Sequence, residues 1–146
     1  MRSILRLTLL ADGRSDACLL SLLRWLVAEI MREVQIEPVF ADLAAMREPP
    51  RLLSARIRAA IELYPCDLLF VHRDAETQTV EDRVGEIQRA IGATMAAGQW
   101  VPVVPVRMTE AWLLVDERAI REAAANPSGK APLGLPPLSR LESLPS

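Results

Sequence analysis

The sequence predicts a doubly wound α/β domain in which a mostly parallel sheet of four strands carries helices on both faces. Short apolar and β-branched runs alternate with stretches whose apolar residues recur every three or four positions, and this order is typical of successive β-α-β units. One run, 67–71, is almost wholly apolar, as expected for a strand that is covered on both sides. A helix between successive strands lets them run parallel, and such crossover connections are right-handed.

Four segments are predicted to be strands. They are residues 4–10, 35–40, 67–71 and 100–106. The last contains Pro102 and Pro105, and proline cannot donate a hydrogen bond to a neighbouring strand. We therefore expect this strand to lie at or near an edge of the sheet, or to carry a bulge.

Helical spacing of apolar residues follows each of the first three strands. The predicted helices span about 16–33, 52–64 and 80–95. Ser15 or Asp16 is expected to cap the start of the first helix, and Gly98 to cap the end of the third. Asp116 is expected to begin a short final helix, which Asn126 and the proline after it end.

The composition indicates one globular domain, residues 1–125, followed by an extended or mobile, proline-rich tail, residues 126–146. The chain has 146 residues, of which 51% are hydrophobic and 25% charged, and no apolar stretch reaches the roughly 20 residues that span a bilayer. No export signal is evident. We therefore expect a cytoplasmic protein without a membrane partner, and no feature indicates an oligomeric state.

The charge and the cysteines limit the partners of the domain. A formal net charge of -2 excludes the strongly basic surface of a non-specific nucleic-acid binder, so any contact with nucleic acid is expected to be local. Cys18 and Cys66 lack the spacing of a metal site. We expect both to be reduced thiols in the core.

Acidic side chains follow three of the four predicted strands. Asp12 follows the first, Asp74 and Glu76 the third, and Glu110 the fourth. Ligands of open α/β sheets bind outside the carboxyl ends of the strands, so these side chains are expected to converge. Mg²⁺ is commonly held by one or two carboxylates together with water and substrate phosphates. The sequence therefore predicts a site for Mg²⁺, or for Mn²⁺, at this edge.

A glycine and three arginines at the same strand ends predict contacts with phosphate or substrate. Gly13 permits close approach of the backbone to a ligand, and the helix after it offers free N–H groups. Arg14, Arg73 and Arg107 have two opposed interpretations. They contact substrate phosphate, or they neutralise the carboxylates in an ion-pair network that leaves no room for a metal.

Other residues near these positions favour a structural interpretation. Asp16 fits a helix cap better than a ligand, and His72, the single histidine, fits a hydrogen-bonded structural residue better than a base. Trp112 is expected to bury its ring under the sheet edge, although an exposed indole stacks well on a nucleic-acid base. Trp25 and Trp100 are expected to pack in the core or between helix and sheet.

Three motifs together resemble a TOPRIM-like domain. They are LLADGRSD at 9–16, LLFVHRDAE at 68–76 and TEAWLL at 109–114. More narrowly, they resemble a bacterial family of unknown function related to the TOPRIM part of overcoming-lysogenization-defect nucleases, in which Glu-Gly, Asp-x-Asp and Glu-Ala-Trp motifs recur. The likeness spans roughly residues 4–126.

The resemblance implies a Rossmann-like, TOPRIM-type fold and Mg²⁺-dependent cleavage or joining of phosphodiesters. It also implies that the protein is a nuclease that acts in bacterial defence or DNA maintenance. It assigns general acid/base work to Asp12 and metal binding to Asp74 and Glu76. We expect Glu110 to be catalytic as well, and Asp12 to contribute to the metal site. The family has Glu at the first position and Asp at the last. Both differences keep the charge and move the oxygen atoms.

Two other functions fit the same sequence. One is a non-catalytic domain of this fold, whose acids are salt-bridged and whose surface serves binding or assembly. The other is a phosphate-ligand pocket of the nucleotide-binding kind, built from Gly13 and the helix at Asp16.

Overall fold

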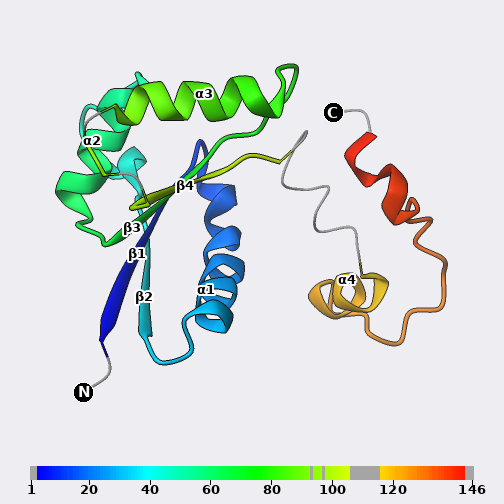
Figure 1. Cartoon of the computed structure of the whole chain (residues 1–146). Helices are drawn as coiled ribbons and strands as arrows, with labels where there is room; N and C mark the ends of the chain where they lie inside the picture. The colour runs from blue at the N-terminus through cyan, green and yellow to red at the C-terminus, as the bar shows by residue number, and fades with distance from the viewer. Residues whose placement is uncertain (1–2, 93, 97, 106–115, 144–146) are drawn as a thin grey trace.

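The protein forms a parallel four-stranded sheet in the order β2-β1-β3-β4 (Figure 1). This computed structural model describes residues 3–92, 94–96, 98–105 and 116–143. The strands are β1 (Ile4–Leu10), β2 (Gln35–Phe40), β3 (Leu68–His72) and β4 (Trp100–Val103). β2 lies beside β1 on one side and β3 lies beside it on the other. The direction in which strands are added to the sheet therefore reverses between β1 and β3, which makes this the switch point. The predicted α/β, Rossmann-like fold is confirmed.

Both edge strands carry a proline that faces away from the sheet. The N–H of Gln35 donates to the strand beside it, and Pro38 lies three residues later, on the opposite side of β2. In β4 the carbonyl of Val103 accepts from β3, so Pro102 faces outward. No hydrogen bond within the sheet is lost at either proline. The predicted edge position of the fourth strand is confirmed, although the strand ends at Val103 and not at residue 106.

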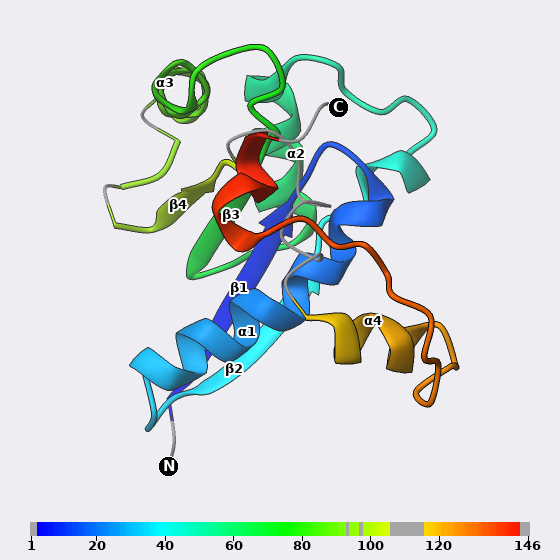
Figure 2. The same cartoon turned by 90° about the vertical axis from the view of Figure 1, so that its right-hand side faces the viewer.

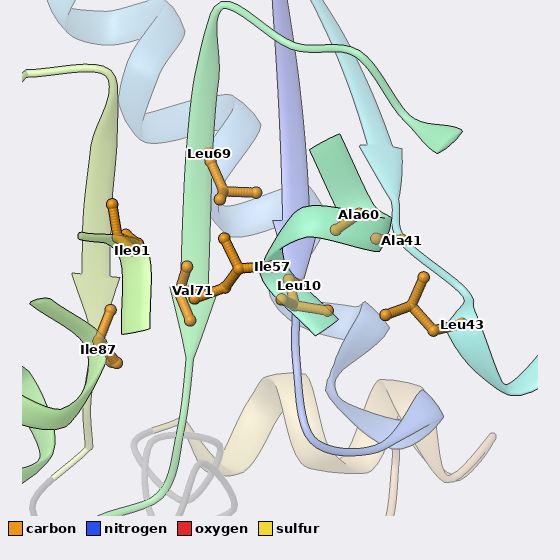
Figure 3. Packing of buried hydrophobic residues seen from close by; sticks show 9 residues of the cluster. All are labelled: Leu10, Ala41, Leu43, Ile57, Ala60, Leu69, Val71, Ile87 and Ile91. Carbon is orange, nitrogen blue, oxygen red and sulfur yellow. The ribbon is translucent and has the colours of Figure 1, made fainter. Parts of the chain in front are cut away.

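Helices cover both faces of the sheet (Figure 1). Helix α1 (Leu19–Ile30) lies on one face, and α2 (Leu53–Leu63) and α3 (Val80–Ile91) lie on the other. Successive strand residues point to opposite faces, so Leu9 belongs to the α1 core while Leu10 belongs to the core beneath α2 and α3. Figure 3 shows the second core. Its buried members are Leu10, Ala41, Leu43, Ile57, Ala60, Leu69, Val71, Ile87 and Ile91.

The ends of two helices differ from the sequence prediction. A 3-10 turn, η1 (Arg14–Cys18), precedes α1, which begins at Leu19 with Cys18 at its N-cap. The expected cap at Ser15 or Asp16 is therefore wrong. Helix α3 ends at Ile91, and Gly92, with φ of 50°, takes the C-cap position that we expected for Gly98.

The remaining elements follow the sheet edge and the C-terminal part of the chain. A 3-10 turn, η2 (Leu43–Ala45), follows β2, and α4 (Glu117–Ala123) starts as predicted, because Asp116 Oδ1 accepts the N–H groups of the first helical turn. The tail is not wholly extended, since it forms the 3-10 helix η4 (Leu138–Ser143). Figure 2 shows α4 and the chain after it on the α1 side of the sheet. Within the described ranges no helix is both long and apolar enough to cross a membrane.

The tryptophans and cysteines follow the prediction only in part. Trp25 is 58% exposed on α1, so its expected core position is wrong, whereas Trp100 packs against the core beneath α2 and α3. Cys18 and Cys66 are both free thiols, as predicted. However, Cys18 is exposed and Cys66 is only partly buried, so neither is a fully buried core residue.

A candidate site in a charge network at the switch point

The loops that follow β1 and β3 meet at the carboxyl end of the sheet. These two strands are neighbours at the point where the strand order reverses, which is the usual ligand position in open α/β folds. Residues 11–13 come from the first loop and residues 73–76 from the second. A hydrogen bond of 3.2 Å from Arg73 Nε to Asp12 Oδ2 joins the loops directly.

Asp12 is held by two arginines. Arg56, in the first turn of α2, donates from Nη1 to Asp12 Oδ1 at 2.7 Å, and Arg73 donates to the other oxygen. Arg56 also donates from Nη2 to the carbonyl of Ala11 at 2.6 Å. Partial burial acts to raise the pKa of Asp12, but Arg56 and Arg73 outweigh it and hold that pKa below its ordinary value. Asp12 is therefore a carboxylate at neutral pH, with both oxygens engaged.

The ion pairs continue from Asp12 along α3. Arg73 pairs with Glu86, and Glu86 Oε2 accepts from Arg83 Nη1 at 2.9 Å. Arg83 Nη2 lies 3.5 Å from Glu76 Oε2. We call this set the charge network: Arg56, Asp12, Arg73, Glu86, Arg83 and Glu76. It alternates in sign and ties α2 and α3 to the loops after β1 and β3.

Arg83 is the most deeply placed member of the charge network. Its side chain is only 9% exposed, and its Nε donates to the carbonyl of Asp74 at 3.0 Å. Glu76, its outermost partner, has a 70% exposed side chain and a left-handed backbone with φ of 53°, a conformation that costs a non-glycine residue about 1 kcal/mol. Arg83 thus holds the loop that carries the predicted metal ligands.

His72 joins the two loops a second time. Its side chain is fully buried at the end of β3, with Nδ1 3.5 Å from Asp16 Oδ2 and Nε2 3.4 Å from Asp74 Oδ1. The same Asp16 oxygen accepts the N–H of Gly13 at 3.0 Å. The buried position of His72 agrees with a structural role. The Gly13 N–H is therefore used inside the turn.

Arg14 lies beside the charge network and pairs with a different acid. It forms a two-pronged contact with Asp42, from Nε at 3.0 Å and from Nη2 at 2.7 Å, and this pairing lowers the pKa of Asp42. A small pocket of about 40 Å³ is lined both by this ion pair and by Asp12, Gly13 and Arg56. Its volume is suited to a few water molecules or one small group.

The described acids, as they lie, do not gather around one point. In the described part of the chain, no three side chains of His, Cys, Asp or Glu group closely enough to hold an ion. Asp12 would first have to exchange its two guanidinium partners. Arg73 pairs with Asp12, as in the interpretation in which the arginines neutralise the site carboxylates, whereas Arg14 pairs with Asp42, which is not one of the predicted site acids. Glu110 and Arg107 lie outside the described residues, as does Trp112, so the full predicted set remains a prediction.

The side chains that reach the site from α2 and α3 were not predicted from the sequence. Arg56 lies in the first turn of α2, and Arg83 and Glu86 lie one turn apart on α3. The rule that directs attention to strand ends leaves out side chains that reach the same edge from a covering helix. The one available signal was the opposite charge of Arg83 and Glu86 at a spacing of three residues, which places them on one helix face.

No family model, curated protein or solved structure matches this chain. The likeness to TOPRIM-like domains therefore rests on the three motifs alone. The first two end in the loops that meet at the switch point, and the third lies outside the described residues.

Proposed function

We propose that this domain binds the phosphodiester backbone of nucleic acid at the carboxyl edge of its sheet and cleaves it with the help of Mg²⁺ or Mn²⁺. The observation that carries the proposal is the junction of the loops after β1 and β3 at the switch point. At this junction Asp12 contacts Arg73, and Asp74 is the residue that follows Arg73 in the same loop. Acids and arginines at one sheet edge suit a phosphate ligand that arrives with a cation.

The residues of the chain supply two parts of this function. Arg56 and Arg73 are directed at one point in the first loop and are suited to an oxyanion, which arginine recognises with paired N–H groups. Asp12, Asp74 and Glu76 would hold the cation after Asp12 leaves its arginines. Mg²⁺ held by these residues would supply positive charge beside the phosphate and a water of lowered pKa.

A second function is favoured by one observation. Both oxygens of Asp12 accept hydrogen bonds from guanidinium groups, and the other acids of the charge network are also paired. A network of this kind is complete without a metal. It supports a non-catalytic domain in which the ion pairs fix the loops and the surface serves binding or assembly.

Cleavage of labelled single- and double-stranded DNA and RNA with added Mg²⁺ or Mn²⁺ separates the two functions. Metal-dependent cleavage by the wild type is expected to be lost in Asp74→Asn and in Asp12→Asn, purified in parallel. Asp67→Asn is the matched control, because Asp67 pairs with Arg6 next to the amino end of β3, away from the site. It should cleave like the wild type.

Thermal unfolding gives an independent measurement of the metal. Mg²⁺ or Mn²⁺ together with a non-cleavable oligonucleotide is expected to raise the Tm of the wild type more than that of Asp74→Asn, because a ligand that binds only the folded state stabilises it. If neither ion changes the Tm and no nucleic acid is cut, the catalytic proposal is wrong and the non-catalytic function remains.

A further inference from the structure

We propose that Arg56 and Arg73 form a binding site for a phosphate oxyanion, which Asp12 occupies as an internal anion until the ligand displaces it. The identity of the ligand class rests on the proposed function, whereas the exchange itself requires no metal. Asp12 then has a second role, because it competes with the substrate for the two guanidinium groups.

The geometry of the two arginines carries the inference. They come from different elements, α2 and the loop after β3, yet they donate to the two oxygens of one carboxylate, at 2.7 and 3.2 Å. Two oxygens of a phosphate present nearly the same acceptor pattern as a carboxylate, and the planar guanidinium suits both. A site that clamps Asp12 from two sides is therefore shaped for a phosphate.

The cations are anchored, while the anion is the more accessible partner. Arg56 is fixed by its second hydrogen bond to the carbonyl of Ala11, and Arg73 by Glu86. The side chains of Arg56 and Arg73 are 18% and 20% exposed, whereas that of Asp12 is 41% exposed. Solvent reaches Asp12 and a ligand can do the same. Displacement then moves one side chain and leaves the arginines in place.

The charge balance gives a third argument. The charge network holds three arginines and three carboxylates, so it is neutral with Asp12 in place. When Asp12 leaves, three positive charges face two negative ones, and one positive charge is in excess. A phosphodiester group carries one negative charge and restores the balance. The small pocket beside Asp12 and Gly13 is also bordered by Arg56.

The test is a binding titration of the metal-free protein in the presence of a chelator. The probes are inorganic phosphate, thymidine monophosphate and short oligodeoxythymidylate, and the readout is the backbone amide NMR signals of residues 11–13 and 73–74. Asp12→Asn removes the competing charge and keeps the side-chain shape. We expect it to bind phosphate about fivefold more tightly than the wild type, because a partly exposed ion pair contributes up to about 1 kcal/mol.

Arginine variants supply the opposite arm of the experiment. Arg56→Gln should lose most of the phosphate affinity, and Arg56→Lys, which keeps the charge without the paired donors, should bind several-fold more weakly than the wild type. Asp67→Asn is the control, since it releases Arg6, a single arginine that is 52% exposed. It should bind like the wild type. Stronger binding of the oligonucleotide than of the monophosphate would assign the site to a nucleic-acid backbone, and the reverse order would assign it to a free nucleotide.

The result is distinguishable from that of the cleavage experiment. If Asp12→Asn binds phosphate no more tightly than the wild type, or Arg56→Gln binds equally well, the exchange is wrong even when the wild type cleaves DNA. If Asp12→Asn binds more tightly and the wild type cleaves nothing, the exchange stands and the catalytic proposal fails.

Discussion

Replacement of Arg83 by methionine tests whether the charge network holds the loop after β3. The methionine keeps the apolar stem of the side chain but removes the guanidinium, which donates to Glu86 at 2.9 Å and to the carbonyl of Asp74 at 3.0 Å. Because the Arg83 side chain is only 9% exposed, water cannot donate to both acceptors, Glu86 and the carbonyl of Asp74, in its place. The variant should be less stable, and the signals of the loop should broaden.

The expected loss can be estimated from these two contacts. Both contacts use the charged guanidinium as donor, and a hydrogen bond to a charged group contributes about 1.5–3 kcal/mol. Burial of methionine recovers part of that sum, and Glu86 keeps Arg73 as a partner. We therefore expect the free energy of unfolding to fall by about 2–3 kcal/mol, a large share of the roughly 5–15 kcal/mol of an ordinary domain.

Urea unfolding followed by far-UV circular dichroism measures this change. A double-mutant cycle with Glu86→Gln should give a coupling energy of at least about 1 kcal/mol. The matched control is Arg118→Met on α4, whose side chain is 86% exposed and pairs with Glu122 one turn away; it should change stability by less than about 0.5 kcal/mol. A loss for Arg83→Met as small as that of the control would refute the reasoning.

Three further predictions concern the core, an exposed ion pair and the thiols. Ile57→Ala, at a fully buried position of α2, should lower the free energy of unfolding by about 2–5 kcal/mol in urea. Arg6 lowers the pKa of Asp67 from 3.8 to about 2, so the wild type should have a higher Tm than Asp67→Asn above pH 4, and the difference should shrink below pH 4 and be lost as the pH falls through about 2; a difference at pH 2 as large as that above pH 4 would contradict this. Burial raises the pKa of the Cys66 thiol, so Ellman's reagent should react with exposed Cys18 first, and equal rates in the single-cysteine variants would be the contrary result.

The sheet was predictable because its strands are recorded in the local pattern of the sequence. The run from Ile4 to Leu10 is apolar except for Arg6 and Thr8. Leu9 and Leu10 enter cores on opposite faces, and adjacent apolar residues of this kind identify a strand covered on both sides. Its predicted bounds agree with those of β1. Pro102 likewise indicated an edge strand from the chemistry of proline alone.

The first helix was predicted less well because its start depends on distant residues. An acid before an apolar periodic stretch usually caps the helix, but Asp16 is drawn into a 3-10 turn, where it accepts the Gly13 N–H and faces His72 from β3. That histidine lies 56 positions further along the chain. Nothing in the local sequence shows the contact, so the pattern placed the helix start three residues too early.

The meeting of the loops after β1 and β3 could be predicted from the sequence, but the ion-pair partner of each charged side chain could not. The fold rule places the ends of neighbouring strands together, and Asp12 and Arg73 do meet there. Arg56 and Glu86 reach the same place from α2 and α3, and the helix packing that brings them there follows from the whole core. The sequence therefore indicated a charged edge, whereas the choice of partner for each acid required the folded structure.

The outward-facing prolines of the two edge strands have a consequence for solubility. An exposed sheet edge is a template on which another chain can add a strand, and this is a common first step toward amyloid. Pro38 and Pro102 each remove one outward N–H donor from such an edge. An incoming strand would find a gap in its hydrogen-bond register on either side, which protects the domain against polymerisation through its sheet.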